Sequence, residues 1–132
     1  MKHLPTIAGG LLGFLFVAFS MIYFFKLMDM PPPPAGSPVA MFMEALVPTG
    51  YMNFVKTCEL LGGILVAIPR TRNFGLLLLG PVIVNILAFH VFLTKGAGLL
   101  DPILIVICLL AVYLLWDGRK AFLGLLGSRQ DA

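Results

Sequence analysis

The stretch that decides the fold is residues 50–93, which read GYMNFVKTCELLGGILVAIP, RTR and NFGLLLLGPVIVNILAFHVFL. Two apolar segments of membrane-spanning length are joined here by a short basic turn. Four polar side chains interrupt the apolar sequence, namely Lys56, Glu59, Asn85 and His90. Because polar and ionisable groups are costly in hydrocarbon, they indicate a functional site. The rest of the chain is expected to enclose this group.

The composition of the whole chain points to a membrane protein. Of its 132 residues, 60% are hydrophobic and only 11% are charged, and the mean hydropathy is +1.02. Soluble domains carry about 25% charged residues, so we expect the solvent of this chain to be the lipid bilayer. The basic residues stand at the ends of apolar segments rather than in a patch with interleaved aromatics, which excludes nucleic-acid binding.

Four apolar segments are long enough to predict membrane-spanning helices. At about 1.5 Å per residue each approaches the roughly 30 Å of the hydrocarbon core. The first segment is longer than the apolar region of about 7–15 residues that a signal peptide carries, so we expect it to be retained. The sequence therefore predicts one all-α transmembrane domain over residues 1–132, an integral membrane four-helix bundle. The predicted spans are residues 7–28, 50–68, 74–93 and 99–116.

The connecting segments differ in character. Residues 29–49 form a proline-rich loop, in which four consecutive prolines favour polyproline II. Within it, residues 39–47 are apolar but too short to span, which predicts a short helix in the interface or across the mouth of the bundle, with Glu44 towards water. The tail, residues 117–132, contains GRKAFLGLLG and is expected to lie along the membrane surface.

The distribution of basic residues predicts the orientation. With both termini cytoplasmic, the inner side carries six Lys or Arg residues and the outer side two. The loop at residues 29–49 is then external and the tail cytoplasmic. All four polar residues fall in the outer half of the bilayer, since each lies within about 13 Å of an outer helix end. The inner set is Lys2, Arg70, Arg72, Arg119, Lys120 and Arg129, and the outer set is Lys26 and Lys95.

The four polar residues are candidates for ligand binding or proton relay. Lys56 and Glu59 are three residues apart and share a helical face, so we expect an ion pair that tolerates burial, binds a polar headgroup or passes protons. Asn85 suits either a hydrogen bond between helices or a ligand contact. His90 suits a hydrogen-bonded position near the interface, a donor to a ligand carbonyl, or a proton relay.

Glycines and helix-start residues predict structural roles. Gly62 and Gly63 are expected to allow close contact with a neighbouring helix, and Gly9 and Gly13 form a second face of small residues. Since it lacks an N–H, proline inside a helix produces a kink. The remaining expectations are a kink at Pro81, a cap at Asp101 for the last span and a cap at Thr6 for the first.

The cysteines and histidines do not predict a metal. Cys58 and Cys108 stand far apart in apolar segments, without a CxxC pair or metal-ligand spacing, and the sequence leaves open whether they are bonded. His90 is the one histidine inside the predicted spans, which excludes bis-histidine haem within the chain. We therefore expect no metal site.

Two motifs together resemble the DoxX family of small bacterial four-helix membrane proteins. They are FMEALVPTGYMNFVKTCELLGGILV at residues 42–66 and PVIVNILAFHVFL at residues 81–93. The matching positions in the first motif are the TGY of residues 49–51, Lys56, Glu59 and the Gly-Gly of residues 62–63. In the second motif they are Pro81, Asn85 and His90. The resemblance covers most of the chain and implies a multi-pass protein of the bacterial inner membrane.

The family resemblance also implies a role in membrane redox chemistry. Its members are linked to thiosulfate:quinone oxidoreduction and to membrane redox or detoxification complexes. The function we expect is an accessory or structural subunit of a larger redox or electron-transfer complex, with other membrane subunits and the lipid bilayer as partners. The alternative is a quinone-linked oxidoreductase component, in which an outward-facing polar pocket formed by the four candidate residues holds a quinone.

Overall fold

The computed structural model describes residues 3–29 and 31–126 and is all-α over these ranges. A 3₁₀ turn, η1 (Pro69–Thr71), precedes the fourth α-helix, and a π-helix, η2 (Phe89–Leu93), follows it. The six α-helices of the described residues are α1 (Leu4–Phe25), α2 (Pro38–Leu46), α3 (Tyr51–Ala67), α4 (Arg72–Ala88), α5 (Pro102–Asp117) and α6 (Arg119–Leu126).

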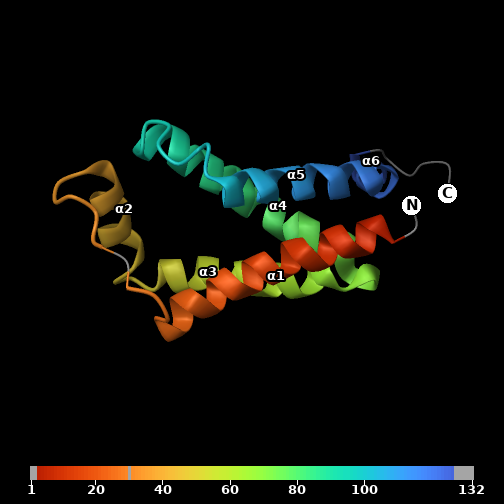
Figure 1. The fold of residues 1–132 in the computed structure, drawn as a ribbon, viewed down its shortest axis with the longest axis horizontal. Coiled ribbons are helices and arrows are strands. Elements are labelled where there is room, and N and C mark those ends of the chain that lie inside the picture. Colours follow the sequence, from red (N-terminus) through yellow and green to blue (C-terminus); the bar gives the residue numbers. More distant parts are fainter. Residues whose placement is uncertain (1–2, 30, 127–132) are drawn as a thin grey trace.

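The helices form two layers that diverge towards one end (Figure 1). Helices α1 and α3 lie side by side in one layer, and α5 and α6 lie in the other. Helix α4 crosses from the first layer to the second, and α2 lies across the end where the layers are furthest apart. The first residues of α1 and the last of α6 lie at the opposite end. The core at the crossing is formed by Leu12, Phe16, Val66, Leu79 and Leu114.

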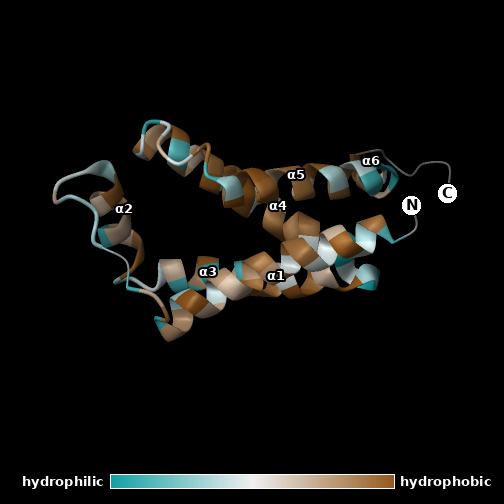
Figure 2. Cartoon of the chain, in the orientation of Figure 1, coloured by the Kyte–Doolittle hydropathy of each residue, from teal (hydrophilic) through white to brown (hydrophobic). Residues whose placement is uncertain are grey.

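The described helices fit a multi-pass membrane protein. Two helical stretches, Leu4–Phe25 and Pro69–Leu93, are long and apolar enough to cross a membrane, and a third span is added if the bent pair of α5 and α6 is counted as one. Figure 2 shows apolar residues along the long helices and hydrophilic residues mainly towards the two ends of the molecule. Such a surface is in contact with the lipid bilayer.

Helices α3 and α5 match the other two predicted spans but are shorter. They have 17 and 16 residues, which gives each a length of about 25 Å against a hydrocarbon core of about 30 Å. The topology with four crossings therefore stays a prediction.

The ends of the predicted spans need correction. Helix α1 runs three residues earlier than the predicted 7–28, because Pro5 fits its first turn and Lys26 ends it with a left-handed φ of 52°. Thr6 lies inside α1 and His3 is the N-cap residue, so the expected Thr6 cap was wrong. Because α1 starts at Leu4, Thr6 is the third residue of the helix rather than the residue that precedes it.

The last predicted span also begins later than residue 99. Helix α5 starts at Pro102, and the Asp101 carboxylate accepts a hydrogen bond of 2.8 Å from the Ile103 N–H. Asp101 therefore lies at the cap position, while Leu99 and Leu100 belong to the preceding turns. The third predicted span, residues 74–93, instead begins two residues earlier, at Arg72, and its last five residues form η2.

The external loop contains the short helix that its apolar segment predicts. Helix α2 begins after Ser37, whose side chain accepts a hydrogen bond of 3.1 Å from the Ala40 N–H. Glu44 is exposed on its outer side. The Ser-Pro pair at residues 37–38 is the start signal, which our prediction from residue 39 overlooked.

Glycines allow α1, α3 and α4 to approach closely. A Cβ atom on Gly63 would lie 3.0 Å from the Gly13 carbonyl oxygen, and one on Gly9 would lie 2.8 Å from a carbonyl oxygen of α3. On the other side of α3, a Cβ on Gly62 would lie 2.6 Å from a methyl carbon of Leu79 in α4. Substitution by any larger residue would therefore separate these helices.

The C-terminal segment turns away from α5. Helix α6 makes an angle of 71° with α5 and exposes Leu123, Leu125 and Leu126. The expected surface segment is thus helical over residues 119–126, while residues 127–132 lie outside the described part of the chain. Cys58 and Cys108 are both free thiols, so the structure contains no bond between them.

Candidate functional site

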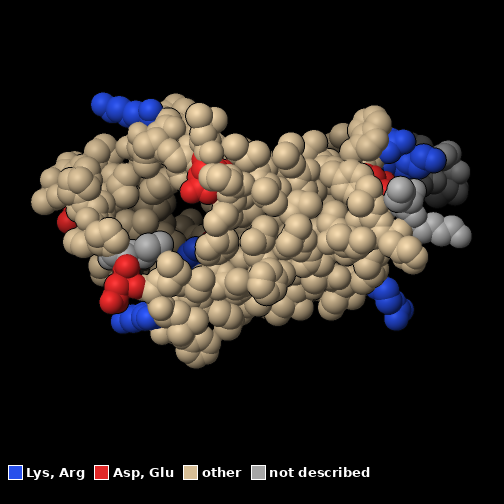
Figure 3. Space-filling model, viewed as in Figure 1, with Lys and Arg blue, Asp and Glu red and all other residues tan. Residues whose placement is uncertain are grey.

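The four polar residues named from the sequence line one cavity of about 550 Å³. The cavity lies between α2, α3, α4 and η2, at the end where the two layers diverge. Figure 3 shows a hollow in this part of the surface, with acidic and basic side chains near its rim. Apart from Lys56, Glu59, Asn85 and His90, its walls are mainly apolar and are formed by Phe42, Met43, Leu46, Tyr51, Met52, Val55, Pro81, Val82, Ile86 and Phe89.

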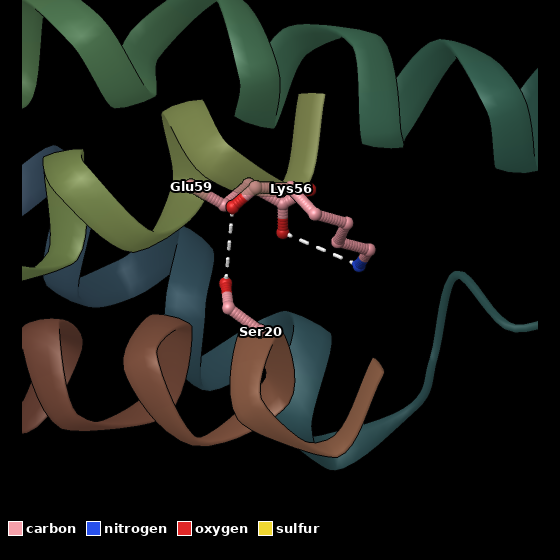
Figure 4. A network of polar contacts seen from close by, with 3 residues as sticks. All are labelled: Ser20, Lys56 and Glu59. Atoms are coloured by element: carbon pink, nitrogen blue, oxygen red, sulfur yellow. Dashed lines mark hydrogen bonds and ion pairs between the residues drawn. The ribbon is translucent and has the colours of Figure 1, made fainter. Parts of the chain in front are cut away.

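Lys56 and Glu59 form an ion pair on α3. The Lys56 Nζ donates to Glu59 Oε1 at 3.5 Å, and the two side chains are 23% and 7% exposed. Ser20, which is fully buried in α1, donates a hydrogen bond of 3.4 Å to the Lys56 carbonyl oxygen. Figure 4 shows Ser20 approaching the pair from below. The pair is therefore anchored to α1 at its base.

The Lys56 ammonium also faces an aromatic ring of α1. It lies 5.7 Å from the centroid of the Tyr23 ring, a distance at which a cation is attracted to the face of a ring. The Tyr23 hydroxyl in turn donates to Asn53 Oδ1 at 2.8 Å. The charge of Lys56 is thus held between a carboxylate and a ring, with N–H groups left for a ligand.

Asn85 lies one helical turn after Pro81 on the exposed side of α4. Its Nδ2 donates a hydrogen bond of 2.8 Å to the Pro81 carbonyl oxygen. This bond lies within α4, and no hydrogen bond from Asn85 to another described helix accompanies it. Helix α4 continues through Pro81 from Arg72 to Ala88. The second Asn85 N–H and its Oδ1 remain for a ligand in the cavity.

His90 is positioned by the π-helix η2. Its Nδ1 lies 2.8 Å from the Ile86 carbonyl oxygen, and its own carbonyl oxygen accepts hydrogen bonds from the Thr94 hydroxyl at 2.7 Å and from the Gly96 N–H at 2.6 Å. π-Helical turns are rare in proteins, but those that occur are often found at functional sites. Apart from the turn residues that follow it, nothing in the sequence predicted η2.

The hydrogen bond of His90 distinguishes its two ring nitrogens. A carbonyl oxygen only accepts, so Nδ1 carries the ring proton and donates it to Ile86. In the neutral ring Nε2 is then an acceptor. The structure thus shows His90 hydrogen-bonded within its own helical stretch, and its expected roles towards a ligand stay predictions.

Helix α2, predicted to lie in the interface or across the mouth of the bundle, supplies one wall of the cavity. Phe42 packs edge-on against Phe89 of η2, with ring centroids 5.2 Å apart. Met43 and Leu46 line the cavity beside it. The spacing of these three residues on one helical face was a usable signal, because residues three and four apart share a face.

The donor set of the site suits an organic ligand rather than a metal. Over residues 3–29 and 31–126, no group of three or more His, Cys, Asp or Glu side chains is arranged to hold a metal ion. The cavity instead combines apolar walls with a few converging polar groups, and its volume falls within the about 300–1,000 Å³ of small-molecule sites.

The fold and the cavity define the class as an all-α, multi-pass membrane protein with a mainly apolar cavity at one end. The chain is similar to a curated protein of Bacillus subtilis (strain 168), Uncharacterized protein YwoB, with 37% identity over 75 residues. The match covers 57% of this chain and 47% of the relative, so the chain spans about half the length of the curated relative it matches. No family model matches the chain, and no solved structure matches it.

Proposed function

We propose that this chain is one DoxX-like transmembrane domain of the bacterial inner membrane, which crosses the bilayer four times. The two motifs at residues 42–66 and 81–93 support the family, and the order of α1, α3, α4 and α5 supports four crossings. The start of α1 and the end of α6 lie on one side of the molecule, and the excess of Lys and Arg predicted for that side supports cytoplasmic termini and a cavity that opens outward.

The function that the site supports best is binding of a lipophilic small molecule with a polar head, within a redox complex of the membrane. The observation that carries it is the convergence of four polar residues from α3, α4 and η2 on one mainly apolar cavity. A quinone-like molecule fits these walls, because its apolar tail lies against side chains such as Met52 and Val55 while its head meets the polar groups.

The chain's own residues would then bind and orient the head of the ligand. Lys56 donates a hydrogen bond, and Glu59 accepts one or holds a proton beside it. A bound quinone supplies the electron-transfer chemistry when electrons arrive from a partner subunit. The apolar walls and α2 keep bulk water from the head.

The experiment is to measure the small molecules that copurify with the protein in mild detergent. We expect a quinone-like compound with the wild-type protein and at least about tenfold less with Glu59→Gln or Lys56→Ala, since each change removes a charged hydrogen-bonding group. The matched control is Glu44→Gln, which removes an exposed carboxylate of α2 outside the cavity. Equal amounts in all four proteins would refute the proposal.

A second candidate is an accessory or structural subunit of a larger membrane complex. The observation that favours it is the broad apolar surface of α4 and η2, on which Phe74, Val84 and Phe92 are strongly exposed. Partner helices pack on such a surface as readily as lipid does. A gentle pull-down from native membranes, read by native mass spectrometry, tests it, and a solitary protein would count against it.

A further inference from the structure

The polar groups of the cavity differ in what they can offer a ligand. Among the described residues that line it, Lys56 is the one Lys or Arg side chain, and part of its hydrogen-bonding capacity goes to Glu59 Oε1. Glu59 keeps a second carboxylate oxygen, and Asn85 keeps Oδ1 after donating to Pro81. Lys56 and the second Asn85 N–H remain as donors, so the cavity offers a ligand both donors and acceptors.

His90 is the acceptor whose role is most firmly set. Its Nδ1–H is used by the Ile86 carbonyl oxygen at 2.8 Å, and no donor among the described residues reaches Nε2. The ring is also backed by Gly98, where a Cβ atom would lie 2.9 Å from Cδ2 and 3.2 Å from Nε2. The imidazole is thus held in one orientation and tautomer, with a lone pair left for a ligand.

Aromatic rings pack beside the His90 ring. The Phe89 and His90 ring centroids are 5.4 Å apart at an interplanar angle of 73°, and Phe42 packs on Phe89 at 5.2 Å. Offset and edge-to-face contacts with aromatic groups are favoured at such surfaces. A flat aromatic head is therefore the shape that these walls accommodate beside Nε2.

We propose that the cavity binds a lipophilic phenol, either a long-chain phenol or a hydroquinone, whose hydroxyl donates a hydrogen bond to His90 Nε2. This inference rests on the proposed ligand-binding function and specifies the chemical class of the ligand. The carbonyl of an oxidised quinone has no proton to donate, so neutral His90 prefers the hydroxyl-bearing form. His90 acts here as a binding residue.

The test compares two probes that differ in one hydrogen-bond donor. Full-length protein in nanodiscs is titrated with 4-nonylphenol and with its methyl ether, 4-nonylanisole, and empty nanodiscs correct for partition into lipid. We expect the phenol to bind about tenfold more tightly or better, because the ether leaves Nε2 without a partner.

Two variants separate the two ring nitrogens of His90. In His90→Asn the amide N–H can still reach the Ile86 carbonyl, but the acceptor at the position of Nε2 is gone. The phenol and the ether should therefore bind this variant about equally. In His90→Gln the longer amide places an oxygen acceptor near that position, and the preference should be kept. Thermal unfolding of each variant checks that it is folded.

The outcomes distinguish this inference from the function on which it rests. If neither probe binds the wild-type protein, both the ligand-binding function and the inference fail. If both probes bind equally, the cavity binds a ligand but the inference is overturned, and this result needs no variant. A phenol preference that survives in folded His90→Asn also overturns it, since the donor then meets another group.

Discussion

The packing of α1 against α3 through Gly13 yields a prediction whose size follows from the structure. In Gly13→Ala the added Cβ would overlap the Gly63 carbonyl oxygen and lie 2.8 Å from the Ala67 Cβ, where ordinary contact is 3.4–4 Å. One of these partners is a backbone atom and the other is a Cβ fixed to the backbone, so neither can rotate away. The two helices must move apart.

The expected destabilisation is the difference between two effects. Overpacking of a close contact costs about 1–3 kcal/mol, while replacing glycine by alanine within a helix contributes about 0.5–1 kcal/mol of stability. We therefore expect Gly13→Ala to lower the free energy of unfolding by about 1 kcal/mol, and by about 2.5 kcal/mol at most.

Gly10 provides the matched control in the same helix. A Cβ on Gly10 meets nothing within 4 Å, so Gly10→Ala should leave stability unchanged or raise it slightly. Both variants are unfolded reversibly by a denaturing detergent in mixed micelles, and the loss of helical circular dichroism is followed. If Gly13→Ala is as stable as Gly10→Ala, the close approach of α1 and α3 is not what holds the first layer together.

Three further predictions concern the ion pair, a helix cap and the topology. Replacing Lys56 by methionine should destabilise the protein by about 1–3 kcal/mol. This is less than the loss of about 3–5 kcal/mol for a fully buried pair, because the Lys56 side chain is 23% exposed. Adding Glu59→Leu should restore much of the lost stability in the same unfolding assay. Asp101→Ala should cost about 1 kcal/mol by removing the hydrogen bond to the first turn of α5, and Asp101→Asn, which still accepts that bond, should cost less. A reporter enzyme fused after Arg72 should be active in the cytoplasm and one fused after Gly96 outside, and the reverse pattern would place the cavity on the inner side of the membrane.

Much of the fold was predictable because local rules govern it. A run of apolar residues about 20 long has one stable form in lipid, the helix, since every backbone polar group must be bonded within the segment. The i, i+3 spacing alone placed Lys56 beside Glu59, and Asp followed by Pro placed the start of α5 at Asp101 and Pro102. Errors of two or three residues arose at ends set by Pro5 and by Lys26, where the chain adopts a left-handed turn.

The candidate site was predictable as a set of residues but not as a geometry. Hydrophobicity made Lys56, Glu59, Asn85 and His90 conspicuous, because polar groups are rare in apolar helices. The hydrogen-bond partners of Asn85 and His90 were not predictable. Each amide or imidazole can bond within its own helix, to another helix or to a ligand, and only the rotamer and the local turn decide among them.

The sequence by itself determined that this chain is an all-α membrane protein with a cluster of polar residues, because composition and periodicity fix which solvent and which secondary structure are stable. Only the tertiary structure decided that α4 crosses between the layers, that α2 contributes Phe42 to the wall of the cavity, and that η2 presents His90 with Nδ1 already bonded. These features depend on contacts between segments distant in the chain and on a single π-helical turn. The spacing of residues along the chain does not determine these contacts or this turn, since the same residues in another packing would meet different partners.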